Sequence, residues 1–367
     1  MKSLNACLIL FSMVFSGLLV SCNPPKPSLT RIEPTSDLIK YHGRINWLDS
    51  LQPEFYWPGS GLSITFQGKA LYADYYDSTG EVYLNIVYDQ DSLRYLKLEK
   101  GLNKILVAEF AEEETHRIDI IKRNEWMVTG PLNFKGLTLE EGQLLAPPQY
   151  ADKVIEFFGN SITAGYAIED LTGGDRMDSI YSNNYYTYAA TTARYFNADY
   201  YATVQSGIGI MVSWNPEIMP ELYNRLNPYD SASIWDFSLS EPDVVVVNLG
   251  QNDSWIVNIP ENEQFKIRFG DTRPSIAEWQ MAYSSFIQKI RIAYPSAHIV
   301  CAIGSMDATA ADSSWPDYIQ EVADDLEDPN MSTIVFPFTN TNGHPRVIHN
   351  RAMADQLIAH LEQVMSW

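Results

Sequence analysis

The chain has 367 residues, a length that suits two domains better than one. Hydrophobic residues make up 46% of the chain and aromatic residues 13%, so a globular protein with a sizeable buried core is expected. The formal net charge of −21 repels phosphate backbones and therefore disfavours a nucleic-acid partner.

The first residues have the pattern of an export signal. Lys2 precedes an apolar stretch from Cys7 to Val20, which is too short for a membrane span. The stretch ends in Leu19-Val20-Ser21-Cys22, which resembles a bacterial lipobox. We therefore expect a signal peptide at 1–22, lipidation of Cys22, a tether at 23–38, and a membrane-anchored lipoprotein at the cell surface or in the periplasm. The alternative is an ordinary secretory signal with an unrelated cysteine.

The remaining cysteine and the histidines give no sign of a metal site. With Cys7 in the signal and Cys22 lipidated, only Cys301 remains, so no intramolecular disulfide is expected. Cys301 lies in an apolar run, which indicates a core residue rather than a nucleophile. No spacing of His, Asp or Glu predicts a metal ligand set.

Short strand-like segments fill the chain from about Tyr41 to Leu145, and no convincing helix interrupts them. This pattern predicts an all-β sandwich, a jelly roll, over 39–146. The proline pair in Ala146-Pro147-Pro148 marks the boundary. The expected strands are Leu62–Phe66, Ala70–Tyr76, Val82–Tyr88, Arg94–Leu98, Lys104–Ala108 and His116–Lys122.

Strands alternate with helices in the second half, over 150–367. Continuous apolar strands in this arrangement predict an α/β domain, with a parallel sheet between two layers of helices. Functional sites in such domains lie beyond the C-terminal ends of the strands. The expected strands are Val154–Phe158, Tyr200–Val204, Asp243–Leu249, His298–Ile303 and Thr333–Phe336, and the expected helices are Asn184–Tyr195, Ile276–Tyr294 and Asn350–Met365.

Three motifs follow expected strands, and a fourth precedes the last helix. Gly159-Asn160-Ser161-Ile162-Thr163 offers a serine near a helix N-terminus, and Gln205-Ser206-Gly207 offers a backbone N–H that can approach a substrate oxygen closely. Asn248-Leu249-Gly250-Gln251-Asn252-Asp253 offers an amide donor. Asn342-Gly343-His344-Pro345 offers a histidine that the proline biases towards an extended conformation. Each motif alone is equally typical of a cap, a turn or a structural histidine.

Together, in the order Ser, Gly, Asn, His, the four resemble blocks I, II, III and V of the SGNH (GDSL-like) hydrolases over about residues 150–367. The N-terminal half is similar to the β-domain of carbohydrate esterase family 2. The segments that carry this similarity are Gly43-Arg44, Phe55-Tyr56-Trp57-Pro58-Gly59-Ser60, Tyr83-Leu84-Asn85, Lys122-Arg123-Asn124-Glu125 and the linker Leu144-Leu145-Ala146-Pro147-Pro148.

The resemblance implies a serine esterase that removes O-acetyl groups from plant polysaccharides such as xylan or glucomannan, without a cofactor. It makes Ser161 the nucleophile and His344 the general base. The backbone N–H groups of Ser161 and Gly207 and the side chain of Asn252 form the oxyanion hole. The alternatives are a non-catalytic carbohydrate-binding protein at the cell surface and an esterase for another acylated glycan.

The segment before His344 departs from the family pattern. Many relatives have an orienting Asp two or three residues before this histidine, where the chain has Asn342 and Thr341. The sequence therefore favours a Ser–His dyad, with a backbone carbonyl or Asn342 orienting the ring, but does not decide between a dyad and a triad. His349, at the start of the last helix, is expected to be structural.

Three aromatic residues near the motifs are candidates for stacking on a sugar: Trp255, Tyr166 and Trp214. Core packing is an equally good explanation for Trp255.

Overall fold

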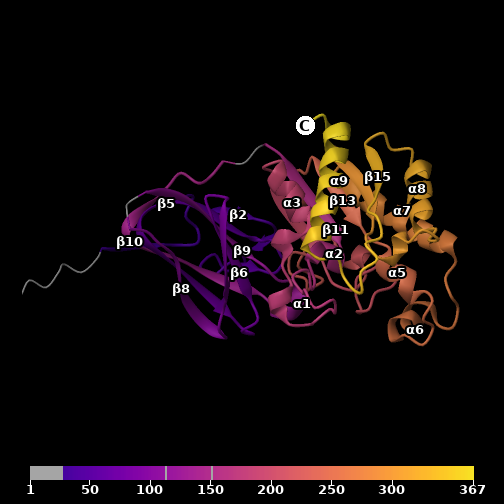
Figure 1. Ribbon diagram of the computed structural model, residues 1–367, viewed down its shortest axis with the longest axis horizontal. Helices are drawn as coiled ribbons and strands as arrows, with labels where there is room; N and C mark the ends of the chain where they lie inside the picture. Colours follow the sequence, from indigo (N-terminus) through magenta and orange to yellow (C-terminus); the bar gives the residue numbers. More distant parts are fainter. Residues whose placement is uncertain (1–27, 112–113, 150–151) are drawn as a thin grey trace, which may run out of the picture.

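The computed structural model describes residues 28–111, 114–149 and 152–367, which form two domains arranged along the long axis of the molecule (Figure 1). The expected signal peptide, Cys22 and the start of the expected tether lie outside these residues. Within the three described ranges, no helix combines the length and apolar character needed to cross a membrane.

The N-terminal half is an antiparallel all-β domain, which confirms the fold class expected for it. The main path of its sheet runs β3-β4-β10-β5-β9-β6-β7, with β1 paired to β10 and with β2 and β8 paired to β5. The elements are β1 (Leu29–Ile32), β2 (Lys40–His42), β3 (Ile45–Asn46), β4 (Glu54–Phe55), β5 (Gly61–Asp77), β6 (Tyr83–Tyr88), β7 (Ser92–Lys97), β8 (Gly101–Glu109), β9 (Thr115–Lys122), α1 (Trp126–Thr129) and β10 (Leu132–Leu145).

Three details of this domain differ from the sequence expectation. The two strands expected at 62–66 and 70–76 are one long strand, β5, because Gly68 lets the chain continue where it passes close to Gly142: a Cβ on Gly68 would lie 2.4 Å from the Cα of Gly142. Residues 29–32, expected in the tether, form β1 and pair with β10, Leu29 opposite Glu140. The short helix α1 interrupts the strands between β9 and β10.

The C-terminal half is an α/β domain with a five-stranded parallel sheet in the order β12-β11-β13-β14-β15. The elements are β11 (Val154–Gly159), α2 (Ser161–Ala164), η1 (Ser179–Tyr181), η2 (Asn184–Tyr186), α3 (Tyr188–Tyr195), β12 (Asp199–Val204), α4 (Met219–Leu222), η3 (Phe237–Leu239), β13 (Val244–Asn248), α5 (Gln251–Ile256), α6 (Glu263–Phe269), α7 (Ile276–Ala293), β14 (His298–Ile303), η4 (Asp307–Thr309), α8 (Trp315–Asp325), β15 (Met331–Val335) and α9 (Val347–Met365).

Helices cover both faces of this sheet, as its continuous apolar strands predict (Figure 1). Successive side chains of a strand point to opposite faces. Val245 and Val247 of β13 therefore share a core with residues of α7 and α8, whereas Val244 and Val246 share a core with residues of α3 and α9. The loops that carry the four motifs follow the C-terminal ends of the strands or precede α9.

The two domains meet through a buried interface. Trp57 and Trp126 of the β-domain belong to the core on the α7 face of the parallel sheet. Beside them, the Arg44 guanidinium donates to the Glu156 carboxylate over 2.7 Å, and both side chains are at most 1% exposed. A shared core and a buried ion pair fix the position of one domain on the other.

Candidate active site

Ser161 lies where β11 turns into α2. Gly159 is required at this turn, because a Cβ there would lie 2.1 Å from Thr163 Oγ1. Asn160 begins the helix, and its side-chain oxygen accepts from the N–H of Ile162 at 3.0 Å. An asparagine oxygen is a favourable helix N-cap, so Asn160 stabilises the start of α2. The turn holds Ser161 nearly buried at the end of the strand.

His344 reaches Ser161 from the loop before α9. Its Nε2 lies 2.7 Å from Ser161 Oγ, within hydrogen-bond distance. His349 points elsewhere: its Nδ1 accepts from the N–H of Arg346 at 3.0 Å and so caps the start of α9, the structural role expected for it. The fold thus brings together the serine of the first motif and the histidine of the last.

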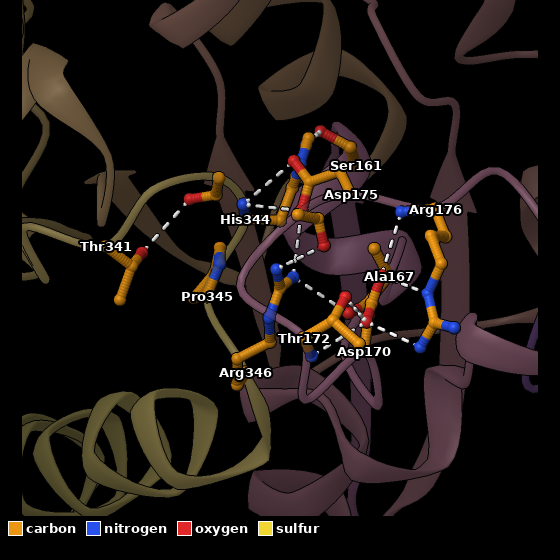
Figure 2. Close-up of polar contacts among 12 residues, drawn as sticks. Ser161, Ala167, Asp170, Thr172, Asp175, Arg176, Thr341, His344, Pro345 and Arg346 are labelled. Atoms are coloured by element: carbon orange, nitrogen blue, oxygen red, sulfur yellow. Dashed lines mark hydrogen bonds and ion pairs between the residues drawn. The ribbon is translucent and has the colours of Figure 1, made fainter.

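The other ring nitrogen of His344 is occupied by an acid that sequence reasoning missed. His344 Nδ1 lies 2.7 Å from Asp175 Oδ2, and the backbone N–H of His344 lies 3.1 Å from both carboxylate oxygens (Figure 2). The expectation of a dyad, with Asn342 or a backbone carbonyl as the orienting group, is therefore wrong. Asn342 is exposed, and among the described residues its side chain makes no hydrogen bond to His344.

Asp175 is held by the segment that carries His344. Arg346 donates to Asp175 Oδ1 at 2.9 Å and to the carbonyl of Gly174 at 2.8 Å (Figure 2). Gly343 allows the Asp175 carboxylate to lie against the backbone before His344, because a Cβ on Gly343 would lie 2.5 Å from Asp175 Oδ1. Burial disfavours the charged carboxylate, but the hydrogen bonds and charge of His344 and Arg346 outweigh burial and lower the pKa of Asp175 to about 2. Asp175 is therefore ionised at neutral pH.

The loop that presents Asp175 is closed by its own ion pair. The Asp170 carboxylate accepts from the N–H of Thr172 at 3.0 Å, the N–H of Arg176 at 2.9 Å and the Arg176 guanidinium at 2.9 Å (Figure 2). The hydrogen bond from the Arg176 side chain is the main reason that the pKa of Asp170 lies below its usual value. This network gives a defined shape to a loop that contains Gly173 and Gly174.

The expected oxyanion donors come from the start of α2 (Ser161), the loop after β12 (Gly207) and α5 (Asn252). Gly207 has a φ of +82°, a conformation that favours glycine. Among the described residues, neither the Ser161 N–H nor the Gly207 N–H has a protein acceptor, so both can bind a substrate oxygen. Asn252 is buried, and its Nδ2 donates to the carbonyl of Ile208 at 2.8 Å, which leaves one of its two N–H groups for a ligand.

Asp253, next to Asn252, shapes the loop after Gly207. Its carboxylate is fully buried and accepts from the N–H groups of Ile210 at 2.9 Å and Met211 at 2.8 Å. Burial disfavours the charged form more than these bonds favour it, which raises the pKa of Asp253 to about 6. The motif that ends in Asn252-Asp253 thus supplies an amide donor from Asn252, and from Asp253 a carboxylate that holds the loop after Gly207.

The three aromatic candidates lie in different surroundings. The Tyr166 ring packs edge-on against the His344 ring with centroids 4.9 Å apart. Trp214 is 44% exposed beside Gly207, within 3.1 Å of where a Cβ on that glycine would lie. Trp255 donates its indole N–H to Asp307 at 2.8 Å, which fixes the ring at the end of α5. Within the described ranges, no group of three or more His, Cys, Asp or Glu residues could hold a metal ion.

Comparisons with known proteins agree with this geometry. The family model described as Carbohydrate esterase 2 N-terminal matches residues 41–148, and the one described as GDSL-like Lipase/Acylhydrolase family matches residues 157–360. Cellulase/esterase CelE of Acetivibrio thermocellus is 29% identical over 90% of this chain, which spans only 40% of that enzyme. An acetylxylan esterase / glucomannan deacetylase of Cellvibrio japonicus is 26% identical over the full length of both chains.

Solved structures show the same two-domain arrangement. A family two carbohydrate esterase from Clostridium thermocellum, solved in complex with cellohexaose, has a TM-score of 0.79 and 28% identity over 90% of this chain and 99% of its own. With its carbohydrate esterase 2 N-terminal domain, the protein is close to the family 2 carbohydrate esterases, and the chain belongs to the GDSL-like Lipase/Acylhydrolase family.

Proposed function

We propose that the protein is a serine esterase that removes O-acetyl groups from plant cell-wall polysaccharides, such as xylan or glucomannan, or from their oligosaccharides. The observation that carries this proposal is the hydrogen-bonded chain from Ser161 Oγ to His344 Nε2 and from His344 Nδ1 to Asp175. The names of the relatives, an acetylxylan esterase / glucomannan deacetylase among them, support the substrate class.

The geometry accounts for attack on the ester. His344 Nε2 takes the hydroxyl proton of Ser161 as Oγ bonds to the acetyl carbonyl carbon. The ionised Asp175 stabilises the resulting imidazolium and keeps Nε2 towards the serine. The carbonyl oxygen gains negative charge and is bound by the N–H groups of Ser161 and Gly207 and by the Asn252 amide.

Breakdown of the tetrahedral intermediate reverses the proton transfer. The imidazolium of His344 protonates the departing sugar oxygen as the carbon–oxygen bond breaks, which leaves an acetyl ester on Ser161. Water then attacks this ester, its proton passing to His344, and acetate departs as Ser161 regains its proton. Tyr166, Trp214 and Trp255 are the aromatic residues that we propose contact the sugar.

Ser161→Ala tests the assignment. The variant keeps its fold, because Ser161 is a small side chain at a turn, but it should release no acetate from acetylated xylan, glucomannan or a simple aryl acetate. Acetate release by the wild type and the variant is measured, with circular dichroism as the control for folding. Wild-type activity in folded Ser161→Ala contradicts the nucleophile assignment, and glycan binding without hydrolysis by the wild type favours the binding-protein alternative.

We further propose that the protein is exported and anchored to the membrane through Cys22. The support is the sequence alone: the apolar stretch up to Val20 and the lipobox-like residues before Cys22. In fractionated cells, the full-length protein should follow the membrane and Cys22→Ser should leave it. Equal membrane association of the two proteins contradicts the anchor.

A further inference from the structure

The peptide unit between Ser206 and Gly207 carries one of the proposed oxyanion donors. In a trans peptide the C=O of one residue and the N–H of the next point in opposite directions. The direction of the Gly207 N–H is therefore set by whatever holds the Ser206 carbonyl. Asn215 Nδ2 donates to that carbonyl at 2.9 Å, which anchors one side of the peptide unit.

A second anchor, on the adjoining peptide unit between Gln205 and Ser206, comes from the N-terminal domain. The backbone N–H of Ser206 donates to Glu125 Oε2 at 2.7 Å. Glu125 lies at the N-cap of α1, is 5% exposed, and precedes Ser206 by 81 residues. Burial raises the pKa of Glu125, and the hydrogen bonds from Ser206 act in the opposite direction. A buried carboxylate of one domain thus binds the backbone of a loop in the other.

Neighbours on both sides keep Glu125 in place. The indole N–H of Trp126 donates to the carbonyl of Val204, the last residue of β12, at 3.3 Å. The hydroxyl of Tyr229 donates to the carbonyl of Trp126 at 2.7 Å. Trp126 also packs edge-on against Trp57 within the shared core. Figure 1 shows α1 against the C-terminal domain. Glu125 is therefore attached to a buried, hydrogen-bonded part of the interface.

From these contacts we propose that Glu125 is a positioning residue for the oxyanion hole, so that the N-terminal domain completes the active site. The inference rests on the proposed esterase function. The Ser206 N–H belongs to the preceding peptide unit, so loss of its acceptor frees the backbone at Ser206 and leaves the Gly207 N–H held only through the bond from Asn215 to the Ser206 carbonyl. The consequence is weaker binding of the tetrahedral intermediate, because an oxyanion donor acts only when it is already in place.

The test compares Glu125→Ala with Glu125→Gln on one soluble acetate ester. Loss of the acceptor should lower the kcat of Glu125→Ala on the order of 10²-fold, near the loss of one oxyanion donor, with KM little changed. Glu125→Gln should retain most of the activity, because its amide oxygen can accept from Ser206. Affinity for a boronic acid, which forms a tetrahedral adduct on Ser161, should fall with kcat in Glu125→Ala.

Lys40→Ala is the matched control. It breaks an ion pair between the same two domains, Lys40 with Asp199 at 3.0 Å, at the opposite end of β12 from the loop. A general weakening of the interface lowers the kcat of Lys40→Ala and Glu125→Ala alike and overturns the inference. Selective loss in Glu125→Ala supports it.

Three further outcomes test the role of Glu125. If Glu125→Ala does not fold, Asn215→Ala tests the adjoining peptide unit, which itself carries the Gly207 N–H, and should show the same loss of kcat and of boronic acid affinity. Unchanged kcat in folded Glu125→Ala, or a change in KM alone, overturns the inference while the esterase assignment stands. A wild-type protein that hydrolyses no ester overturns the proposed function instead.

Discussion

At the scale of single residues, the main finding is the source of the carboxylate beside His344. Asp175 lies 169 residues before the histidine, in the loop between α2 and η1, and not in the segment around Asn342. The two meet because Gly343 leaves room for the carboxylate and Arg346 holds it. An acid from this loop can perform the task for which the family pattern uses the residues just before the histidine.

Asp175→Asn tests this interpretation. We expect kcat to fall on the order of 10²- to 10⁴-fold, because the amide neither stabilises the imidazolium nor enforces the tautomer that Ser161 requires. The kcat of the wild type and of the variant is measured with a soluble acetate ester at neutral pH.

Asn342→Ala is the matched control for Asp175→Asn. Its side chain is exposed and does not hydrogen-bond to the ring of His344, so the variant should resemble the wild type in kcat. An Asn342→Ala variant as impaired as Asp175→Asn is the outcome that contradicts the triad.

At the scale of elements, the loop between β12 and α4 is held by groups outside it as well as by its own hydrogen bonds. Asp253 from α5 binds the N–H groups of Ile210 and Met211, while Asn252 binds the carbonyl of Ile208. Loop backbone that is buried needs such partners, because an unpaired buried N–H or C=O is destabilising. The short helix α5 thus organises the loop that carries Gly207.

The raised pKa of Asp253 predicts a pH dependence of stability. Between the ordinary Asp pKa of about 3.9 and the folded value of about 6, the folded chain retains a proton that the unfolded chain has released. The free energy of unfolding should therefore decrease as pH rises through this window, by about 3 kcal/mol at most. Asp253→Asn cannot ionise, so urea unfolding of both proteins at several pH values should show a smaller decrease for the variant. Identical pH dependence in the two proteins contradicts the prediction.

At the scale of the whole molecule, the ion pair between Arg44 and Glu156 joins the two domains. Both groups are removed from water, which is unfavourable unless each charge is fully paired. Arg44 also donates to the carbonyls of Tyr223 and Arg225, and Tyr294 donates to Glu156. The interface therefore behaves as part of the interior rather than as a separable contact.

Arg44→Met should destabilise the protein by about 3–5 kcal/mol, because it leaves the Glu156 carboxylate buried without its partner. The double variant Arg44→Met/Glu156→Met should recover much of this loss, since it removes both charges. Guanidinium unfolding of the single and double variants measures the difference. A double variant less stable than Arg44→Met shows that the ion pair is not the source of the loss.

Local patterns in the sequence were sufficient for the two fold classes and for most strands of the parallel sheet. The apolar runs around Val154 and Val244 and the closing helix near Asn350 follow from periodicity, which neighbouring residues determine. The pairing of Ser161 with His344 was implied by the resemblance of the four motifs to those of the SGNH hydrolases. The sequence did not show the continuity of β5, because Gly68 looks like a turn residue until its strand partner is known.

Contacts between distant parts of the chain were decided only by the tertiary structure. Asp175 lies among several acidic residues of one loop, and nothing in its neighbours distinguishes it from Asp170 or Asp178 as the partner of His344. Glu125 likewise belongs to a charged run that could as well face solvent, yet it binds the backbone at Ser206. The physical reason is the same in both cases: hydrogen-bond geometry depends on distances in space, and sequence periodicity reports only which face of its own element a residue occupies.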